Sequence, residues 1–167
     1  MPNTAGGVFR DTASYWLQFL QSGIGLTLQG EPNVTTESTW ADGIDTTFSA
    51  RLEAAGIVSH FHTAFNRPFA ANHRIQLEKA TITLKNFFRP LFGDQRLHLE
   101  IQAHDGAESE KISFPAQNYY VNQLAFFIRL LQGQEAPPPL EKVRERIVWM
   151  ESIYEQATPG NATTTGE

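Results

Sequence analysis

The sequence predicts an α+β fold: an open, mostly antiparallel sheet of six or seven strands with helices packed on one face. Apolar residues recur at helical spacing near both ends of the chain, whereas the middle shows the two-residue alternation of strands. A length of 167 residues suits one domain with one core. The order of a helix, a run of strands and two more helices fits an antiparallel sheet whose helices share a face.

The first predicted helix covers residues 9–21. Its apolar side chains recur three and four residues apart, which describes one helical face: Phe9, Ala13, Trp16, Leu17 and Leu20. Gly23 provides a stop signal. Residues 24–31 follow neither the helical nor the strand period of apolar residues.

Three strands come next, separated by turn signals: residues 33–40, 44–53 and 57–65. The turns are Ala41-Asp42-Gly43, which predicts a hairpin, and Ala55-Gly56. Because alternate residues of a strand point to opposite faces, His60 and His62 share one face of the third strand.

The alternating pattern continues in four more segments: residues 73–77, 81–87, 96–103 and 111–114. A loop at residues 89–94 interrupts them. Two helices follow, at residues 118–132 and after Pro137-Pro138-Pro139. Residues 158–167 form a polar, low-complexity tail that we expect to be disordered, so the predicted domain spans residues 6–157.

The composition excludes several functions. A net charge of -5 disfavours a nucleic-acid partner, which needs clustered Lys and Arg. The absence of cysteine excludes disulfides, thiolate nucleophiles and cysteine-ligated zinc. No apolar run reaches the ~20 residues needed to cross a bilayer, and residues 1–7 lack the features of a signal peptide. We therefore expect a cytoplasmic protein with no membrane partner.

The strands also predict self-association. Phe48, Phe61, Phe87 and Leu99 stand at alternating positions of the sheet. If helices cover one face, an apolar second face would need its own cover. We expect a homodimer formed through the sheet face.

Several segments resemble one family. Residues 6–15, GGVFRDTASY, are similar to the GG-x-x-x-D-x-G-x-[HY] segment that opens the C-terminal, substrate-binding domain of the Gfo/Idh/MocA oxidoreductases. Further segments resemble that domain in the same order: GIDTTFSARL at 43–52, GIVSHFH at 56–62, Phe88-Arg89-Pro90, the helix from Tyr119 to Gly133, and 149–157. The resemblance spans roughly residues 6–157, and its specificity rests on the order and spacing of the segments.

Two family features are absent from the sequence. The family's Rossmann domain carries G-x-G-x-x-G, where glycines let the backbone approach a pyrophosphate, and an E-K-P segment whose lysine assists proton transfer. This chain has neither. We therefore expect no cofactor in this chain, with NAD(P) involved only if a separate Rossmann domain is present.

The resemblance places Tyr15 in the acid/base position and makes Asp11 the residue that orients it or the substrate. Four residues apart on a helix, the two side chains share a face. The alternative is that both residues are structural. Asp11 would then stabilise the start of the helix, where negative charge is favoured, and Tyr15 would be a half-buried residue in the wall of the fold. Where the family has a glycine between the two residues, this chain has Ala13, whose methyl group narrows the approach to the pair.

His60 and His62 are further catalytic candidates, because either histidine serves as a general base if it faces the cavity. Their spacing also suits a metal, yet no third ligand stands at compelling spacing, so we predict no metal site. The predicted substrate-binding residues are Trp16, Phe65, Arg67, Phe88 and Tyr119. The alternative is that these side chains belong to the core, to a dimer interface or to solvated surface.

Three functions remain open from the sequence. The preferred one is a stand-alone enzyme that binds a small organic molecule and catalyses a cofactor-independent isomerisation, dehydration or cyclisation. The second is the substrate-binding half of an NAD(P)-dependent oxidoreductase that needs a separate Rossmann domain. The third is a non-catalytic ligand-binding or dimerisation module.

Overall fold

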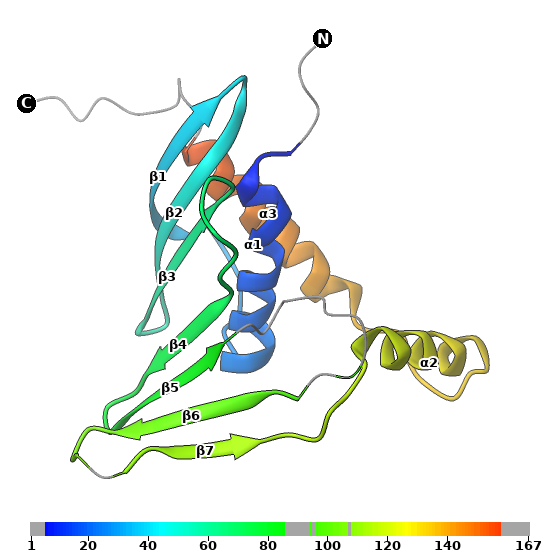
Figure 1. Cartoon of the computed structure of the whole chain (residues 1–167). Coiled ribbons are helices and arrows are strands. Elements are labelled where there is room, and N and C mark those ends of the chain that lie inside the picture. The colour runs from blue at the N-terminus through cyan, green and yellow to red at the C-terminus, as the bar shows by residue number, and fades with distance from the viewer. Residues whose placement is uncertain (1–5, 86–93, 95, 107, 158–167) are drawn as a thin grey trace, which may run out of the picture. The chain divides into compact units, whose positions relative to one another are not determined.

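The computed structural model describes residues 6–85, 94, 96–106 and 108–157. The chain divides into two compact units, one of residues 1–67 and 138–167 and one of residues 68–137 (Figure 1). The predicted α+β class is confirmed. The described residues form three α-helices and seven antiparallel strands, which lie in one three-stranded and one four-stranded sheet.

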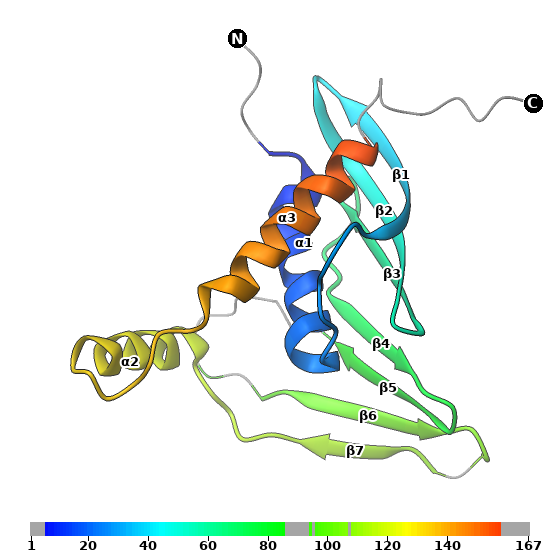
Figure 2. The same ribbon diagram turned by 180° about the vertical axis from the view of Figure 1, so that it is seen from behind.

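The first unit combines the three-stranded sheet with two α-helices and a π-helical turn. Its elements are α1 (Val8–Phe19), η1 (Leu20–Ile24), β1 (Asn33–Ala41), β2 (Ile44–Ala54), β3 (Ile57–Ala64) and α3 (Leu140–Ala157). The strands pair antiparallel in the order β1-β2-β3. Figures 1 and 2 show α1 and α3 together on one face of this sheet, as predicted for the helices.

Both hairpins of the first unit turn through residues with positive φ. Asp42 and Gly43 have φ of 52° and 81°, and Ala55 and Gly56 have φ of 51° and 77°. Two consecutive positive φ values define the type I′ turn, whose twist matches that of the flanking strands. The two turn signals predicted from the sequence therefore lie where the chain reverses.

The core of the first unit lies between the sheet and its two helices. Strand alternation selects the β2 residues that enter it, since Phe48 and Leu52 are buried whereas Arg51 and Glu53 are exposed. The buried apolar residues are Val8, Phe9, Ala13, Trp16, Leu17, Leu20, Leu26, Leu28, Phe48, Ala50, Leu52, Trp149 and Ile153. Each large side chain among them contributes about 1.5–3 kcal/mol on burial.

The first helical segment ends at Ile24, three residues after the predicted end at residue 21. Gly23 lies inside η1, and the left-handed residue that ends the helix is Gly25, with φ of 81°. The amide of Leu26 then donates to the carbonyl of Leu20. A positive φ favours glycine at a helix end, and the two nearby glycines made Gly23 and Gly25 hard to tell apart by sequence.

The opposite face of the three-stranded sheet is polar. Its outward side chains come from all three strands: Thr35, Glu37, Thr39, Thr47, Ser49, Arg51, Glu53, Val58, His60 and His62. Phe48 and Phe61, which we expected to contribute to an exposed apolar face, both lie on the helix side. The homodimer stays a prediction that these two residues do not support.

The second unit contains the four-stranded sheet and one helix. Its elements are β4 (Asn72–Gln76), β5 (Ala80–Lys85), β6 (His98–Ala103), β7 (Glu110–Ser113) and α2 (Tyr119–Leu131). The strands form an antiparallel meander. Asn118 caps α2, because its side-chain oxygen accepts a hydrogen bond from the Val121 amide over 3.3 Å.

The second unit has apolar surfaces but no buried residue among those described. One face of its sheet is formed by cross-strand partners that are all partly exposed: His73, Ile75, Ile82, Leu84, Leu99, Ile101 and Ile112. Several apolar residues of α2 are also exposed: Tyr119, Tyr120, Val121, Leu124, Phe127, Ile128 and Leu131. Surfaces of this kind usually contact another molecule or segment.

Some predictions concern residues that the structure does not describe. The expected tail at 158–167 and most of the loop at 89–94 lie outside the described residues. Within the described ranges, no helix has the length and apolarity needed to cross a membrane.

Candidate functional site

The first turn of α1 is fixed by a carboxylate from another element. Gly7 precedes the helix in an extended conformation, and no neighbouring side chain caps α1. Instead the Phe9 amide donates to Asp45 Oδ2 over 2.8 Å. A Cβ on residue 7 would collide with the Asp45 carboxylate, so Gly7 is required by a close approach. Because a helix N-terminus favours negative charge, Asp45 stabilises α1 from β2.

A β-bulge brings Asp45 inside. The register of β1 and β2 shifts between Thr39 and Trp40, so that Trp40 pairs with Asp45 and Thr46 is the extra residue. This extra residue reverses the alternation, and Asp45 joins Phe48 on the helix side of the sheet. Asp45 is 0% exposed.

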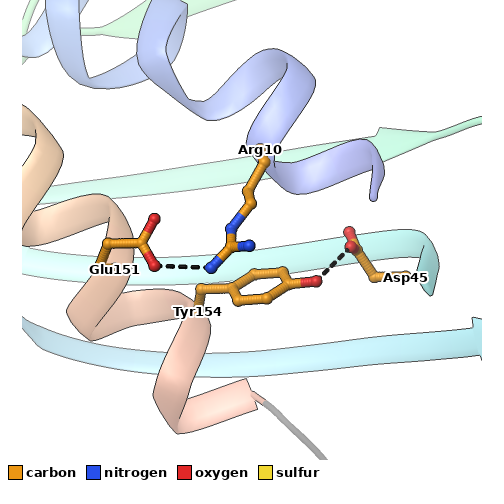
Figure 3. Close-up of polar contacts among 4 residues, drawn as sticks. All are labelled: Arg10, Asp45, Glu151 and Tyr154. Atoms are coloured by element: carbon orange, nitrogen blue, oxygen red, sulfur yellow. Dashed lines mark hydrogen bonds and ion pairs between the residues drawn. The ribbon is translucent and has the colours of Figure 1, made fainter. Parts of the chain in front are cut away.

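Tyr154 of α3 completes this cluster (Figure 3). Its hydroxyl donates to Asp45 Oδ1 over 3.0 Å, and the Arg10 guanidinium lies 4.4 Å from its ring centroid. Arg10 also pairs with Glu151 over 2.7 Å. Burial, followed by the hydrogen bond and charge of Asp45, raises the pKa of Tyr154 to about 12. The phenol therefore stays protonated and keeps donating.

Two polar contacts hold α1 against β3. Thr12 Oγ1 lies 3.0 Å from Thr63 Oγ1, and Trp16 Nε1 donates to Ser59 Oγ over 2.8 Å. The indole also stacks on Phe61, with centroids 4.8 Å apart. These contacts orient α1 about its axis.

The exposed face of α1 carries Asp11 and Tyr15. Both side chains are exposed, Tyr15 by 48%, whereas Ala13, Trp16 and Leu17 of the same helix are buried. One helical turn separates them, as the sequence spacing predicts. A firmly anchored helix thus presents a carboxylate and a phenol to solvent, and we take this face as the candidate site.

His60 and His62 share a strand face, as predicted, but it is the face turned away from the helices. His62 Nδ1 lies 2.9 Å from Ser49 Oγ across the β2–β3 pair. The structure therefore does not bring the histidines together with Asp11 and Tyr15. In the part of the chain that is described, no three His, Asp or Glu side chains form a group able to hold a metal.

The predicted substrate-binding residues are dispersed. Trp16 is only 6% exposed and belongs to the core, whereas Phe65 and Arg67 are exposed beyond β3. Tyr119 belongs to the second unit, where its ring lies 4.4 Å from that of Tyr120. Phe88 lies outside the described residues.

A shallow hollow in the first unit contains none of the predicted site residues. It lies between residues 28–30 and α3, and it is lined by Leu28, Gln29, Gly30, Glu141, Arg144, Glu145, Val148 and Trp149. The Trp149 indole donates to the Gly30 carbonyl over 2.9 Å at this place. The indole contact serves to hold the 28–30 segment on α3.

Sequence reasoning missed Asp45. The residue stands in a segment that resembles the family, yet its burial depends on the bulge at Thr46. By alternation alone, Asp45 belongs with the outward polar residues Thr47, Ser49 and Arg51, so the sequence pattern carried no signal of its burial.

Comparisons with known proteins show a shared fold. No protein-family model matches the sequence, and no curated protein matches it. The chain is similar to a mutant of KijD10, a 3-ketoreductase from Actinomadura kijaniata, in complex with TDP-benzene and NADP. That match has a TM-score of 0.79 and 14% identity, and it covers 95% of this chain and 50% of that one. Another KijD10 structure, with NADP and TDP-benzene, has a TM-score of 0.70 and 12% identity and covers 90% and 45%.

The chain thus has the fold of part of an NADP-bound reductase and spans about half the length of the chains it matches. This finding corrects one expectation. From the sequence we expected no cofactor, whereas the solved structures that share the fold hold NADP. The expectation rested on the absence of a G-x-G-x-x-G loop from this chain, which spans only about half the length of those NADP-bound chains.

Proposed function

We propose that this chain is the substrate-side part of an NADP-dependent ketoreductase, related to the C-terminal domain of the Gfo/Idh/MocA oxidoreductases. The observation that carries the proposal is the exposed phenol of Tyr15, one turn after Asp11 on an anchored helix. Two further facts support it: the resemblance of residues 6–15 to the segment that opens that domain, and the fold shared with KijD10.

The residues of this face fit the reacting end of a reductase. Tyr15 offers an accessible O–H donor, and Asp11 offers a carboxylate one turn away. When NADPH is bound, the chemistry that it supplies is a hydride for the carbonyl carbon of a ketone. The Tyr15 hydroxyl donates its proton to the carbonyl oxygen as the new C–H bond forms, which yields an alcohol, and solvent water returns the proton to the tyrosinate.

Asp11 orients either the Tyr15 hydroxyl or a substrate hydroxyl through a hydrogen bond to its carboxylate. Phe65 and Arg67 stay candidates for contacts with the substrate, since both are exposed in the same unit. Between the alternatives that the sequence leaves open, the shared fold favours the oxidoreductase over the cofactor-independent enzyme and over the non-catalytic module.

The proposal is tested with the purified chain, with and without an added Rossmann domain that binds NADPH, and with a panel of ketones that includes keto-sugars linked to nucleotides. Calorimetry measures binding of TDP-benzene to the chain, and loss of the nicotinamide absorbance measures turnover. We expect ketone-dependent oxidation of NADPH when the added domain is present and none with the chain alone. Tyr15→Phe should lower kcat by about 10²-fold or more, because a positioned general acid contributes about 10²–10⁴-fold.

Glu37→Gln is the control, since Glu37 is exposed on the face of the three-stranded sheet that is turned away from α1. It should leave kcat and the thermal midpoint unchanged. The absence of ketone-dependent NADPH oxidation in the presence of the added Rossmann domain contradicts the proposal. An unaltered kcat in Tyr15→Phe contradicts the assigned role of the phenol.

A further inference from the structure

The cluster behind α1, made of Arg10, Asp45, Glu151 and Tyr154 and here called the Asp45 cluster, connects three elements that are distant in sequence (Figure 3). Arg10 belongs to α1, Asp45 to β2, and the other two residues to α3. The Arg10 and Glu151 side chains pair with each other and are 45% and 47% exposed, whereas Asp45 is fully buried. The contacts of the four residues converge on the first turn of α1.

We propose that Asp45 and Tyr154 are positioning residues for the site on α1. Asp45 holds the helix start through the Phe9 amide, and Tyr154 holds the Asp45 carboxylate, so that Asp11 and Tyr15 are presented in one fixed place. This inference rests on the proposed function, because it concerns the same face of the same helix.

The burial of Asp45 argues that its role is to specify geometry. A fully buried carboxylate is costly unless it is hydrogen-bonded, and well-packed apolar residues often stabilise a fold as well or better. Asp45 is 0% exposed, and its two oxygens each accept one hydrogen bond, from Phe9 and from Tyr154. Unlike an apolar residue, the carboxylate makes directional hydrogen bonds, and these fix the position of the helix start relative to β2.

The position of the helix start is transmitted to the reactive pair. Asp11 lies in the first turn of α1 and Tyr15 in the next, so a shift or tilt of that turn moves both side chains. A displacement of about 1 Å at a catalytic group costs on the order of 10²-fold in rate. Loosening the Asp45 cluster should therefore lower kcat while it leaves the exposed binding surface in place.

Tyr154 offers the cleanest variant, because its ring and its hydroxyl have separate partners. The centroid of the ring lies 5.7 Å from that of Phe9 and 4.4 Å from the Arg10 guanidinium carbon. The hydroxyl donates to Asp45 Oδ1. Tyr154→Phe thus removes the hydrogen bond to Asp45 and keeps the packing of the ring.

The experiment uses the full chain with fluorotyrosine incorporated in place of its 4 tyrosines, with the Tyr15 resonance assigned from Tyr15→Phe. Fluorine NMR reports the surroundings of Tyr15, and NADPH oxidation with the added Rossmann domain and the ketone panel reports kcat and KM. In Tyr154→Phe we expect a shifted or broadened Tyr15 resonance and a kcat lowered about tenfold with KM nearly unchanged. Asp45→Ala should have the larger effect on both readouts.

Two comparisons separate positioning from general loss of structure. Asp45→Asn keeps an oxygen that accepts from the Phe9 amide, so it should recover most of the kcat lost in Asp45→Ala. Ser152→Ala, on the same helix as Tyr154, removes a hydroxyl that donates to Glu31 instead and should change neither readout. If Asp45→Ala does not fold, the Tyr15 resonance and the kcat of Tyr154→Phe and Asp45→Asn test the positioning role.

The outcomes for the two proposals are distinct. A Tyr15 resonance and a kcat that both match the native chain in folded Tyr154→Phe overturn the positioning role and leave the proposed function intact. The absence of NADPH-dependent turnover in the presence of the added Rossmann domain overturns the proposed function. In that case the Tyr15 resonance alone decides the positioning role, with a shift in Tyr154→Phe supporting it and an unchanged resonance overturning it.

Discussion

The Trp16 indole donates to the Ser59 hydroxyl over 2.8 Å while its ring stacks on Phe61, and this pair holds α1 against β3. Trp16→Phe keeps an aromatic ring but leaves Ser59 without this donor. We expect the free energy of unfolding to fall by about 1–3 kcal/mol, as measured by urea denaturation. Ser59→Ala closes a double-mutant cycle, whose coupling energy should be about 0.5–1.5 kcal/mol. A coupling energy of zero would contradict the bond.

Gly7→Ala should be strongly destabilising, by about 3 kcal/mol or more, because the new methyl group collides with the buried Asp45 carboxylate. Gly6→Ala is the matched control. A Cβ on residue 6 would lie 3.2 Å from the Arg10 Cβ, a tight contact and not a collision, so its cost should be well under that of Gly7→Ala. Thermal unfolding followed by circular dichroism compares the two variants, and equal losses would show that Asp45 does not exclude a side chain at residue 7.

Ala55→Gly should stabilise the chain, although most substitutions to glycine do the opposite. Ala55 has φ of 51°, a left-handed conformation that costs an L-residue roughly 1–2 kcal/mol. Glycine relieves this cost but gains entropy in the unfolded chain, so the net gain should be about 0.5–1 kcal/mol in urea unfolding. Ala54→Gly, one residue earlier in β2, should be destabilising. A loss of stability in Ala55→Gly would argue against the type I′ turn.

His73 should make the stability of the second unit depend on pH. Burial lowers the pKa of His73 below 6.5, so the folded chain holds the neutral imidazole. A group of this kind contributes stability that is fully present above pH 6.5 and is lost as the pH falls through its lowered pKa. The protection factors of the β4 and β5 amides, which correct the exchange rates for their intrinsic pH dependence, should therefore fall below that pH.

His73→Leu should weaken this acid sensitivity, because leucine matches the apolar partner Leu84 and does not titrate. The native chain at each pH is the reference. An identical fall of the protection factors in the variant would show that another group causes the loss of stability.

The apolar face of the β4–β7 sheet should mediate the predicted homodimer. Light scattering at micromolar concentration should report a dimer for the native chain and a monomer for Ile101→Lys, which places a charge among Ile82 and its neighbours on that face. Gln102→Lys adds the same charge to the opposite face and should remain dimeric. A monomeric native chain would refute the dimer.

Much of the fold was predictable because secondary structure follows local patterns. The apolar spacing of Phe9, Ala13 and Leu17 located α1, and the turn signals at Asp42-Gly43 and Ala55-Gly56 located both hairpins. The division of seven strands into two sheets was not predicted, since alternation within a strand does not say where pairing stops. The sharing of one helical face by Asp11 and Tyr15 followed from spacing alone.

The sequence alone determined the helices, the hairpins and the placement of Asp11 with Tyr15, because each depends on residues within a few positions of one another. Only the tertiary structure decided that Asp45 is buried beneath α1, that His60 and His62 lie on the face away from that helix, and that the fold matches an NADP-bound reductase. The physical reason is register: one extra residue at Thr46 turns Asp45 inward, and register is a relation between two strands.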